Sequence, residues 1–122
     1  MKKNILIVED DDFFGELISK KLFSRDFSIS LAKNGEDGFK KAKDLKPDVI
    51  LLGLLLHIMD GYEVLLALKD NPETMSIPVI ILSNLSSKDD INRALRLGAS
   101  DFLIKSQIDL DEIISKIDGI IK

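Results

Sequence analysis

Charged and hydroxyl-bearing residues stand directly after short apolar runs at several places along the chain. Glu9 and Asp10 begin an acidic run after "NILIV", Ser83 follows "VIIL", and Lys105 follows "FLI". Carboxylates are the ligands that hard cations such as Mg²⁺ prefer, whereas a hydroxyl and an ammonium bind phosphate oxygens. Brought together, these residue types would suit a magnesium and phosphate site.

Each of these residues also has a simpler interpretation when it is taken alone. An acidic run before a helix commonly supplies the N-cap and favourable charges for the helix dipole. Ser83 alone would be a cap or turn hydroxyl, and Lys105 alone a solvated charge. Three such groups after three apolar runs favour a site, provided that the fold brings the ends of those runs together.

The apolar runs are short, rich in Ile, Leu and Val, and ended by polar residues, which is typical of strands buried on both faces. A weaker alternating segment, "SISLA", predicts an edge strand. The predicted strands are Ile5–Val8, Ser28–Ala32, Val49–Leu52, Val79–Leu82 and Phe102–Ile104.

Helical periodicity fills the intervals between these strands. It begins with a stripe through Phe14 and Leu22 and continues with one through Phe39 that follows "NGED". Three further helices are predicted, at Tyr62–Lys69, Lys88–Leu97 and Leu110–Ile121.

Five strands that alternate with five helices predict parallel βαβ units with right-handed crossovers. The expected fold is a three-layer α/β sandwich of the flavodoxin-like type, with strand order 2-1-3-4-5, as a single domain over residues 1–122. In such a sheet the ligand site lies outside the carboxyl ends of the strands. Residues that end different strands, namely Glu9, Asp10, Gly53, Ser83 and Lys105, should therefore share one edge of the sheet.

Composition excludes several classes of function. The 122 residues carry a formal net charge of -4, with Lys and Arg scattered, so direct nucleic-acid binding is not expected. The absence of cysteine excludes disulfides and thiolate metal sites. The opening "MKKNILIVEDDD" has too short an apolar run for a signal peptide or a membrane span, and we expect a cytoplasmic protein.

The ordered segments "NILIVEDDD", "KPDVILL", "MDGYEVL", "IPVIILS" and "LGASDFLIK" resemble the receiver domain of two-component response regulators. The similarity covers essentially the whole chain. The resemblance implies that Glu9 and Asp10 organise Mg²⁺, that Ser83 is the switch hydroxyl, and that Phe102 is the aromatic residue that changes rotamer. It further implies that Lys105 binds the phosphate.

Two residues depart from the pattern of that family. The phospho-acceptor aspartate corresponds to Gly53, which has no side chain to phosphorylate. A cation could then be held only weakly, by Glu9, Asp10 and the backbone carbonyl of Leu55. His57 replaces the usual loop proline, and it is either an exposed histidine without a role or a transition-metal ligand or general base.

Two milder departures concern neighbours of the site. Ser106 follows Lys105 in place of the family's cis proline, and we expect a trans bond because a cis bond would cost about 3 kcal/mol. Asn84 is larger than the residue usually found there and should narrow access. The sequence leaves open whether a natural degenerate receiver or a deliberate substitution explains Gly53 and His57.

The first functional hypothesis is a phosphorelay receiver that cannot take phosphate on its usual residue, is not an enzyme and acts by docking. The resemblance implies a histidine kinase or phosphotransfer protein and a downstream effector as partners. It places the signalling face on the fourth helix, the fifth strand and the fifth helix, with Arg93, Arg96, Ser106 and Gln107.

Two alternatives remain. An engineered or adventitious metal or catalytic site would use His57, Glu9 and Asp10 around a cavity at Gly53. A third hypothesis moves the phosphate to Asp10, His57 or Ser83, although none of these occupies the acceptor's position.

Overall fold

Strands and helices alternate along residues 2–121, which a computed structural model describes. The strands are β1 Asn4–Val8, β2 Ser28–Ala32, β3 Val49–Leu52, β4 Val79–Ser83 and β5 Asp101–Ile104. The helices are α1 Asp12–Phe23, α2 Gly35–Leu45, α3 Gly61–Lys69, α4 Lys88–Arg96 and α5 Leu110–Ile120.

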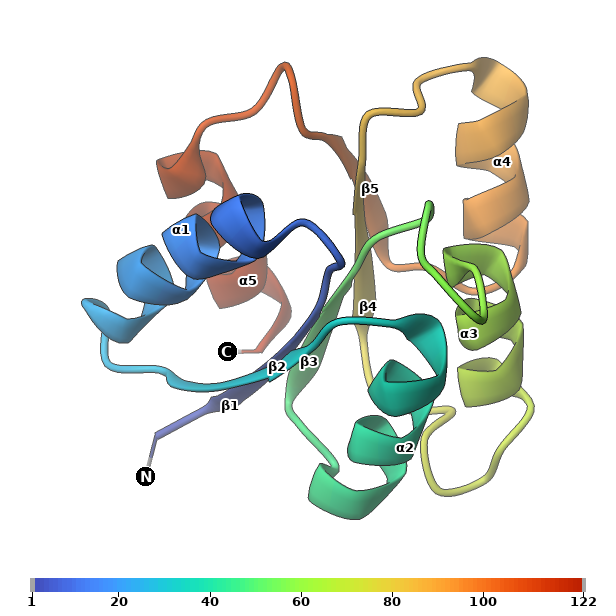
Figure 1. Ribbon diagram of the computed structural model, residues 1–122, viewed down its shortest axis with the longest axis horizontal. Helices are drawn as coiled ribbons and strands as arrows, with labels where there is room; N and C mark the ends of the chain where they lie inside the picture. Colours follow the sequence, from blue (N-terminus) through green and yellow to red (C-terminus); the bar gives the residue numbers. More distant parts are fainter. Residues whose placement is uncertain (1, 122) are drawn as a thin grey trace.

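The strands form one parallel sheet in the order β2-β1-β3-β4-β5, which confirms the predicted three-layer fold. Helices α1 and α5 cover one face, and α2, α3 and α4 cover the other (Figure 1). Val8 lies beside Leu52 in the register, and Ser83 lies beside Ile104. The carboxyl ends of β1, β3, β4 and β5 therefore meet at one edge of the sheet.

The sheet is buried on both faces because its central strands β1, β3 and β4 carry apolar side chains at every position except Asn4 and Ser83. All four residues of β3 are buried, and so are all five of β4. Burying a side chain of this size contributes about 1.5–3 kcal/mol. Alternate residues face opposite layers: Leu6, Val8, Ile50 and Leu52 belong to one core cluster, and Ile5, Ile7, Val49 and Leu51 to the other.

Polar caps fix where the helices begin. Asp60 accepts a hydrogen bond from the backbone N–H of Glu63, and the Glu63 side chain reaches back to the N–H of Asp60. Asp109 and Glu112 form the same capping box on α5. Such a cap contributes about 1 kcal/mol, and the one at Asp60 sets the end of the loop that follows β3.

The edge strand β2 has one of its outward carbonyls covered. Ala32 accepts a bond from the N–H of Glu9, so the preceding carbonyl of Leu31 points away from β1. Lys41 Nζ donates to this oxygen at 2.5 Å and also lies 3.2 Å from Asp37 Oδ2. At Leu31, the open edge of the sheet therefore presents the ammonium of Lys41 rather than an unpaired backbone acceptor.

Within residues 2–121, every helix is too short or too polar to cross a membrane.

Candidate phosphoacceptor pocket

A cavity of about 170 Å³ opens at the carboxyl ends of β1, β3 and β4. It brings together five of the residues that the sequence placed at strand ends. Phe102 and His57 are outside its lining. The lining residues are Glu9, Asp10, Asp11, Gly53, Leu54, Leu55, Leu82, Ser83, Asn84 and Lys105.

Glu9 and Lys105 form an ion pair inside this cavity. The Glu9 side chain is 6% exposed and that of Lys105 is 17% exposed, and Lys105 Nζ contacts Glu9 Oε1. The other oxygen, Oε2, accepts the backbone N–H of Asp11 at 3.1 Å. Burial raises the pKa of Glu9 above its ordinary value, although Lys105 and the Asp11 N–H act in the opposite direction.

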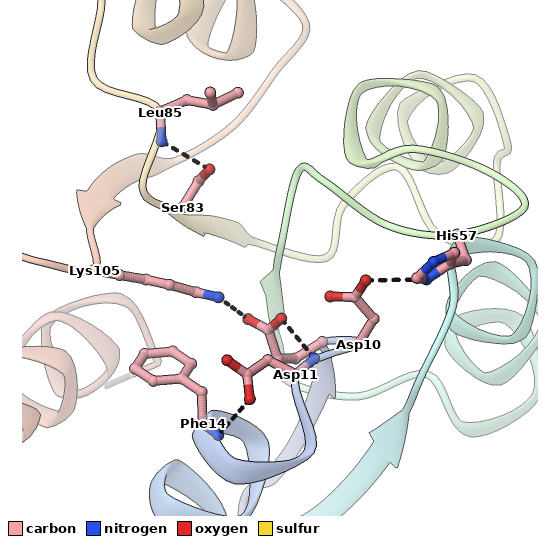
Figure 2. Close-up of polar contacts among 8 residues, drawn as sticks. Asp10, Asp11, Phe14, His57, Ser83, Leu85 and Lys105 are labelled. Atoms are coloured by element: carbon pink, nitrogen blue, oxygen red, sulfur yellow. Dashed lines mark hydrogen bonds and ion pairs between the residues drawn. The ribbon is translucent and has the colours of Figure 1, made fainter.

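Phe14 supports the ammonium of Lys105 from below. Lys105 Nζ lies 4.5 Å from the centre of the Phe14 ring, within the range of a cation–π contact. Figure 2 shows the lysine reaching from its loop toward the acidic residues, with the ring beneath it. Asp11 in turn caps α1 by accepting the N–H of Phe14 at 3.2 Å. The cap agrees with the simpler interpretation of the acidic run as an N-cap, whereas the sequence indicated no role for the Phe14 ring.

One carboxylate oxygen of Asp10 faces His57 (Figure 2). His57 Nδ1 lies 3.1 Å from Asp10 Oδ2, a contact that is an ion pair when the imidazole is protonated. The imidazole is 83% exposed, compared with 24% for the Asp10 side chain. His57 therefore lies on the rim of the pocket, not in the space beside Gly53.

The backbone at Gly53 has room for a side chain. Its N–H donates to the carbonyl of Val8 at 2.9 Å, and it is buried. A Cβ added there would lie 3.3 Å from Leu56 Cδ2 and 3.7 Å from Glu9 Oε1. The nearest atom thus belongs to the flexible end of a leucine, so a small shift would accommodate a larger residue.

The loop between β3 and α3 contains one strained residue. Ile58 has a φ of 71° and is 73% exposed. A β-branched side chain is uncommon in this left-handed conformation, which glycine and asparagine adopt readily. Sequence reasoning did not identify this position, because an isoleucine gives no signal of a left-handed turn.

The predicted switch residues stand in separate environments. Ser83 is buried, and its Oγ accepts the N–H of Leu85 at 3.2 Å. Phe102 is partly buried on β5 beside Ile81 and packs against the core. Asn84 is exposed at the rim of the cavity, and every peptide bond in the part of the chain described here is trans.

The pocket does not present a ready set of cation ligands. Nowhere between residues 2 and 121 do three His, Asp or Glu side chains gather as a metal site. Glu9 is paired with Lys105, and Asp10 is paired with His57. The acidic side chains that the sequence assigned to Mg²⁺ each have a partner from the chain itself.

Comparisons with known proteins agree with this architecture. The sequence profile of the response regulator receiver domain matches residues 5–118. The chain is 37% identical over 105 residues to the response regulator PleD of Caulobacter vibrioides, covering 86% of this chain and 23% of PleD. It is 35% identical over 118 residues to the cell cycle response regulator CtrA of Brucella ovis, covering 97% of this chain and 50% of CtrA. The chain thus spans half or less of the length of these curated relatives.

Solved structures show the same arrangement of elements. The BeF3-activated N-terminal receiver domain of Klebsiella pneumoniae RstA matches with a TM-score of 0.91 at 25% identity, covering 98% of this chain and 99% of that one. The signal receiver domain of a histidine kinase from Syntrophus aciditrophicus matches with a TM-score of 0.89 at 31% identity, covering 98% and 89%. With the family profile matching most of its length and the same sheet order, the chain belongs to the response regulator receiver domain family of two-component signalling.

Proposed function

We propose that this receiver domain does not take phosphate at the position of the usual acceptor and that it acts through protein–protein docking. The observation that carries the proposal is Gly53, which stands in the pocket beside Glu9, Ser83 and Lys105 without a side chain. The surrounding groups are present, and the nucleophile is not.

Phosphoryl transfer needs a nucleophile in line with the leaving group, a means of neutralising phosphate oxygens, and donors for the remaining oxygens. The other candidate acceptors are differently engaged. Asp10 lies against His57, and the Ser83 oxygen already accepts the N–H of Leu85. We therefore consider phosphorylation of Asp10 or Ser83 less well supported than a pocket that takes no phosphate.

Receiver domains are generally signalling domains rather than enzymes, and homologous response regulators interact with histidine kinases or phosphotransfer proteins and with effectors. We propose partners of these kinds for this chain. The face built by α4, β5 and α5 offers them charged and polar contacts, because Arg93, Arg96, Ser106 and Gln107 are all exposed.

Intact-mass measurement tests the proposal. The protein is incubated with acetyl phosphate and Mg²⁺, together with the variants Gly53→Asp and Gly53→Asn. We expect an unchanged mass for the wild type and for Gly53→Asn, and one added phosphate for Gly53→Asp, because only the aspartate supplies a nucleophile. The asparagine variant matches the aspartate in size and controls for filling the cavity.

A phosphorylated wild-type species would overturn the proposal. Peptide mapping of that species would then distinguish Asp10, His57 and Ser83 as the modified residue.

A metal or catalytic site that uses His57 is the second candidate, since His57 Nδ1 lies 3.1 Å from Asp10 Oδ2 and a metal ion would have to replace this contact by binding between the two side chains. We expect Mg²⁺ to bind weakly here, since the acceptor carboxylate is missing, whereas imidazole prefers transition metals. Calorimetric titration with Zn²⁺ compares the wild type with His57→Ala. Equal affinities in the two proteins would eliminate this candidate.

A further inference from the structure

We infer that the exposed face of α1 binds a second copy of this chain, in an antiparallel helix pair about a two-fold axis. The inference goes beyond the proposed function, since it concerns neither the pocket nor the face built by α4, β5 and α5. It commits to a second copy rather than to a different protein, because the charges on this face are complementary to themselves.

Exposed apolar side chains gather on α1. Phe13 is 76% exposed, Phe23 is 69% exposed and Leu17 is 40% exposed. Together with the exposed Glu16 and Lys20, they recur every three or four residues and so share one side of the helix. The opposite side of α1 is buried in the core. A contiguous apolar surface of this kind marks an interaction site.

A shallow cavity of about 330 Å³ lies at the carboxyl-terminal end of this face, between α1 and the edge strand β2. Phe23 and Ile29 form its apolar walls. Lys2 Nζ lies 5.7 Å from the centre of the Phe23 ring, a cation–π contact that holds this wall in place. Since a cavity of about 150 Å³ can hold a benzene molecule, this one has room for a phenylalanine ring.

Antiparallel packing brings an aromatic ring to this cavity. Phe13 and Phe23 lie five residues on either side of Ile18. A two-fold axis at the level of Ile18 therefore places Phe13 of one copy opposite the cavity beside Phe23 of the other. The same symmetry repeats the contact, so both cavities are filled.

Glu16 and Lys20 determine the orientation of the two helices, because they lie two residues on either side of Ile18. Neither side chain forms an ion pair with another residue between positions 2 and 121. In the antiparallel pair, Glu16 of each copy faces Lys20 of the other, which gives two intermolecular ion pairs. A parallel pair would place Glu16 against Glu16 and is disfavoured.

The interface is small, since each copy contributes one helix face and one cavity. Stable interfaces bury about 1,200–2,000 Å², and smaller ones are typical of transient complexes. We therefore expect a dimer that dissociates on dilution, with a dissociation constant on the order of 10–100 µM.

Sedimentation equilibrium over a range of protein concentrations tests the inference. Glu16→Lys and Lys20→Glu each place like charges opposite one another, and each should weaken the dimer at least about tenfold. The double variant restores opposite charges with the signs exchanged, so its dissociation constant should return to within about threefold of the wild-type value. Glu36→Lys, on the exposed side of α2, makes the same change in net charge as Glu16→Lys and should leave the dimer unaffected.

A mixture of the two single variants tests the register of the helices. Each variant alone should be mainly monomeric, but a mixed pair regains opposite charges at both contacts and should dimerise.

A change of apolar contact provides a test that does not depend on charge. Phe13→Ser should weaken the dimer, whereas Leu66→Ser, on the exposed side of α3, should match the wild type. Circular dichroism establishes that each variant is folded before sedimentation.

A wild type that stays monomeric at about 500 µM would overturn the inference. A dimer that the single charge reversals leave unchanged, or that the double reversal fails to restore, would overturn it as well. None of these results changes the mass expected after incubation with acetyl phosphate. Failure of the inference is therefore distinguishable from failure of the proposed function.

Discussion

Glycines stand at both ends of the loop that joins β3 to α3, but the backbone needs only one of them. A Cβ at Gly61 would lie 2.1 Å from the carbonyl oxygen of Gly53, whereas a Cβ at Gly53 would meet nothing closer than Leu56 Cδ2 at 3.3 Å. Gly61 is thus required by close packing of the backbone. Gly53 meets no backbone atom that closely, so the fold itself does not require a glycine at this position of the pocket.

Replacing Gly61 by alanine should give the largest change in stability and so tests the contrast between the two glycines. The added methyl collides with backbone that cannot yield without moving the loop, so we expect a loss of about 4 kcal/mol or more in the free energy of unfolding. Gly53→Ala is the matched control. It should stay within about 1 kcal/mol of the wild type, because reduced entropy of the unfolded chain offsets a small shift of Leu56.

Urea denaturation followed by circular dichroism measures both variants. Comparable destabilisation by the two alanines would show that Gly53 is a structural glycine after all.

Replacing Ile58, in the middle of the same loop, should change the free energy of unfolding by a smaller amount and in the opposite direction. Ile58→Gly should raise the free energy of unfolding by about 0.5–1 kcal/mol, because it relieves a left-handed conformation and loses little burial. Ile58→Val retains the β-branch and should leave stability unchanged. Equal stabilisation by glycine and valine in the same urea assay would argue against strain at φ 71°.

The smallest expected effect is a dependence of the free energy of unfolding on pH, which arises from Glu9 in the pocket. Because burial raises the pKa of Glu9 above its ordinary value of 4.5, the native state binds this proton more tightly than the unfolded chain does. The resulting stabilisation is complete below pH 4.5 and is lost as pH rises through the native pKa. The free energy of unfolding of the wild type, relative to that of Glu9→Gln, should therefore fall as pH rises from 4.5 toward neutrality.

Glu16→Gln, on the exposed side of α1, controls for the loss of a negative charge. A difference between wild type and Glu9→Gln that stayed constant or grew with pH would contradict a raised pKa.

Most of the fold could be predicted because the strands are buried on both faces and therefore appear as continuous apolar runs. β3 occupies the predicted span, Val49–Leu52. β1 begins one residue earlier than predicted, at Asn4, because Asn4 pairs with Ser28 and its N–H donates to Asp48. Helix α3 likewise begins at Gly61, since the capping box at Asp60 sets its start.

The residues that meet in the pocket were also predictable, since parallel strands bring their carboxyl ends to one edge. Which of these side chains contact one another could not be predicted from the sequence. The sequence places several acidic residues after β1, and only the structure shows that Lys105 contacts Glu9 and lies over the Phe14 ring. The position of His57 on the rim similarly depends on the path of the loop, which includes a left-handed isoleucine that no residue preference would suggest.

The ammonium that Lys41 places on the outward carbonyl of Leu31 has a consequence for how this protein behaves in concentrated solution. An uncovered sheet edge can recruit a strand from a neighbouring molecule and so nucleate aggregation. A charged side chain at this position opposes such strand addition, because a second backbone would have to displace the lysine and bury its charge. Lys41 therefore opposes the addition of an intermolecular strand at Leu31 of the β2 edge.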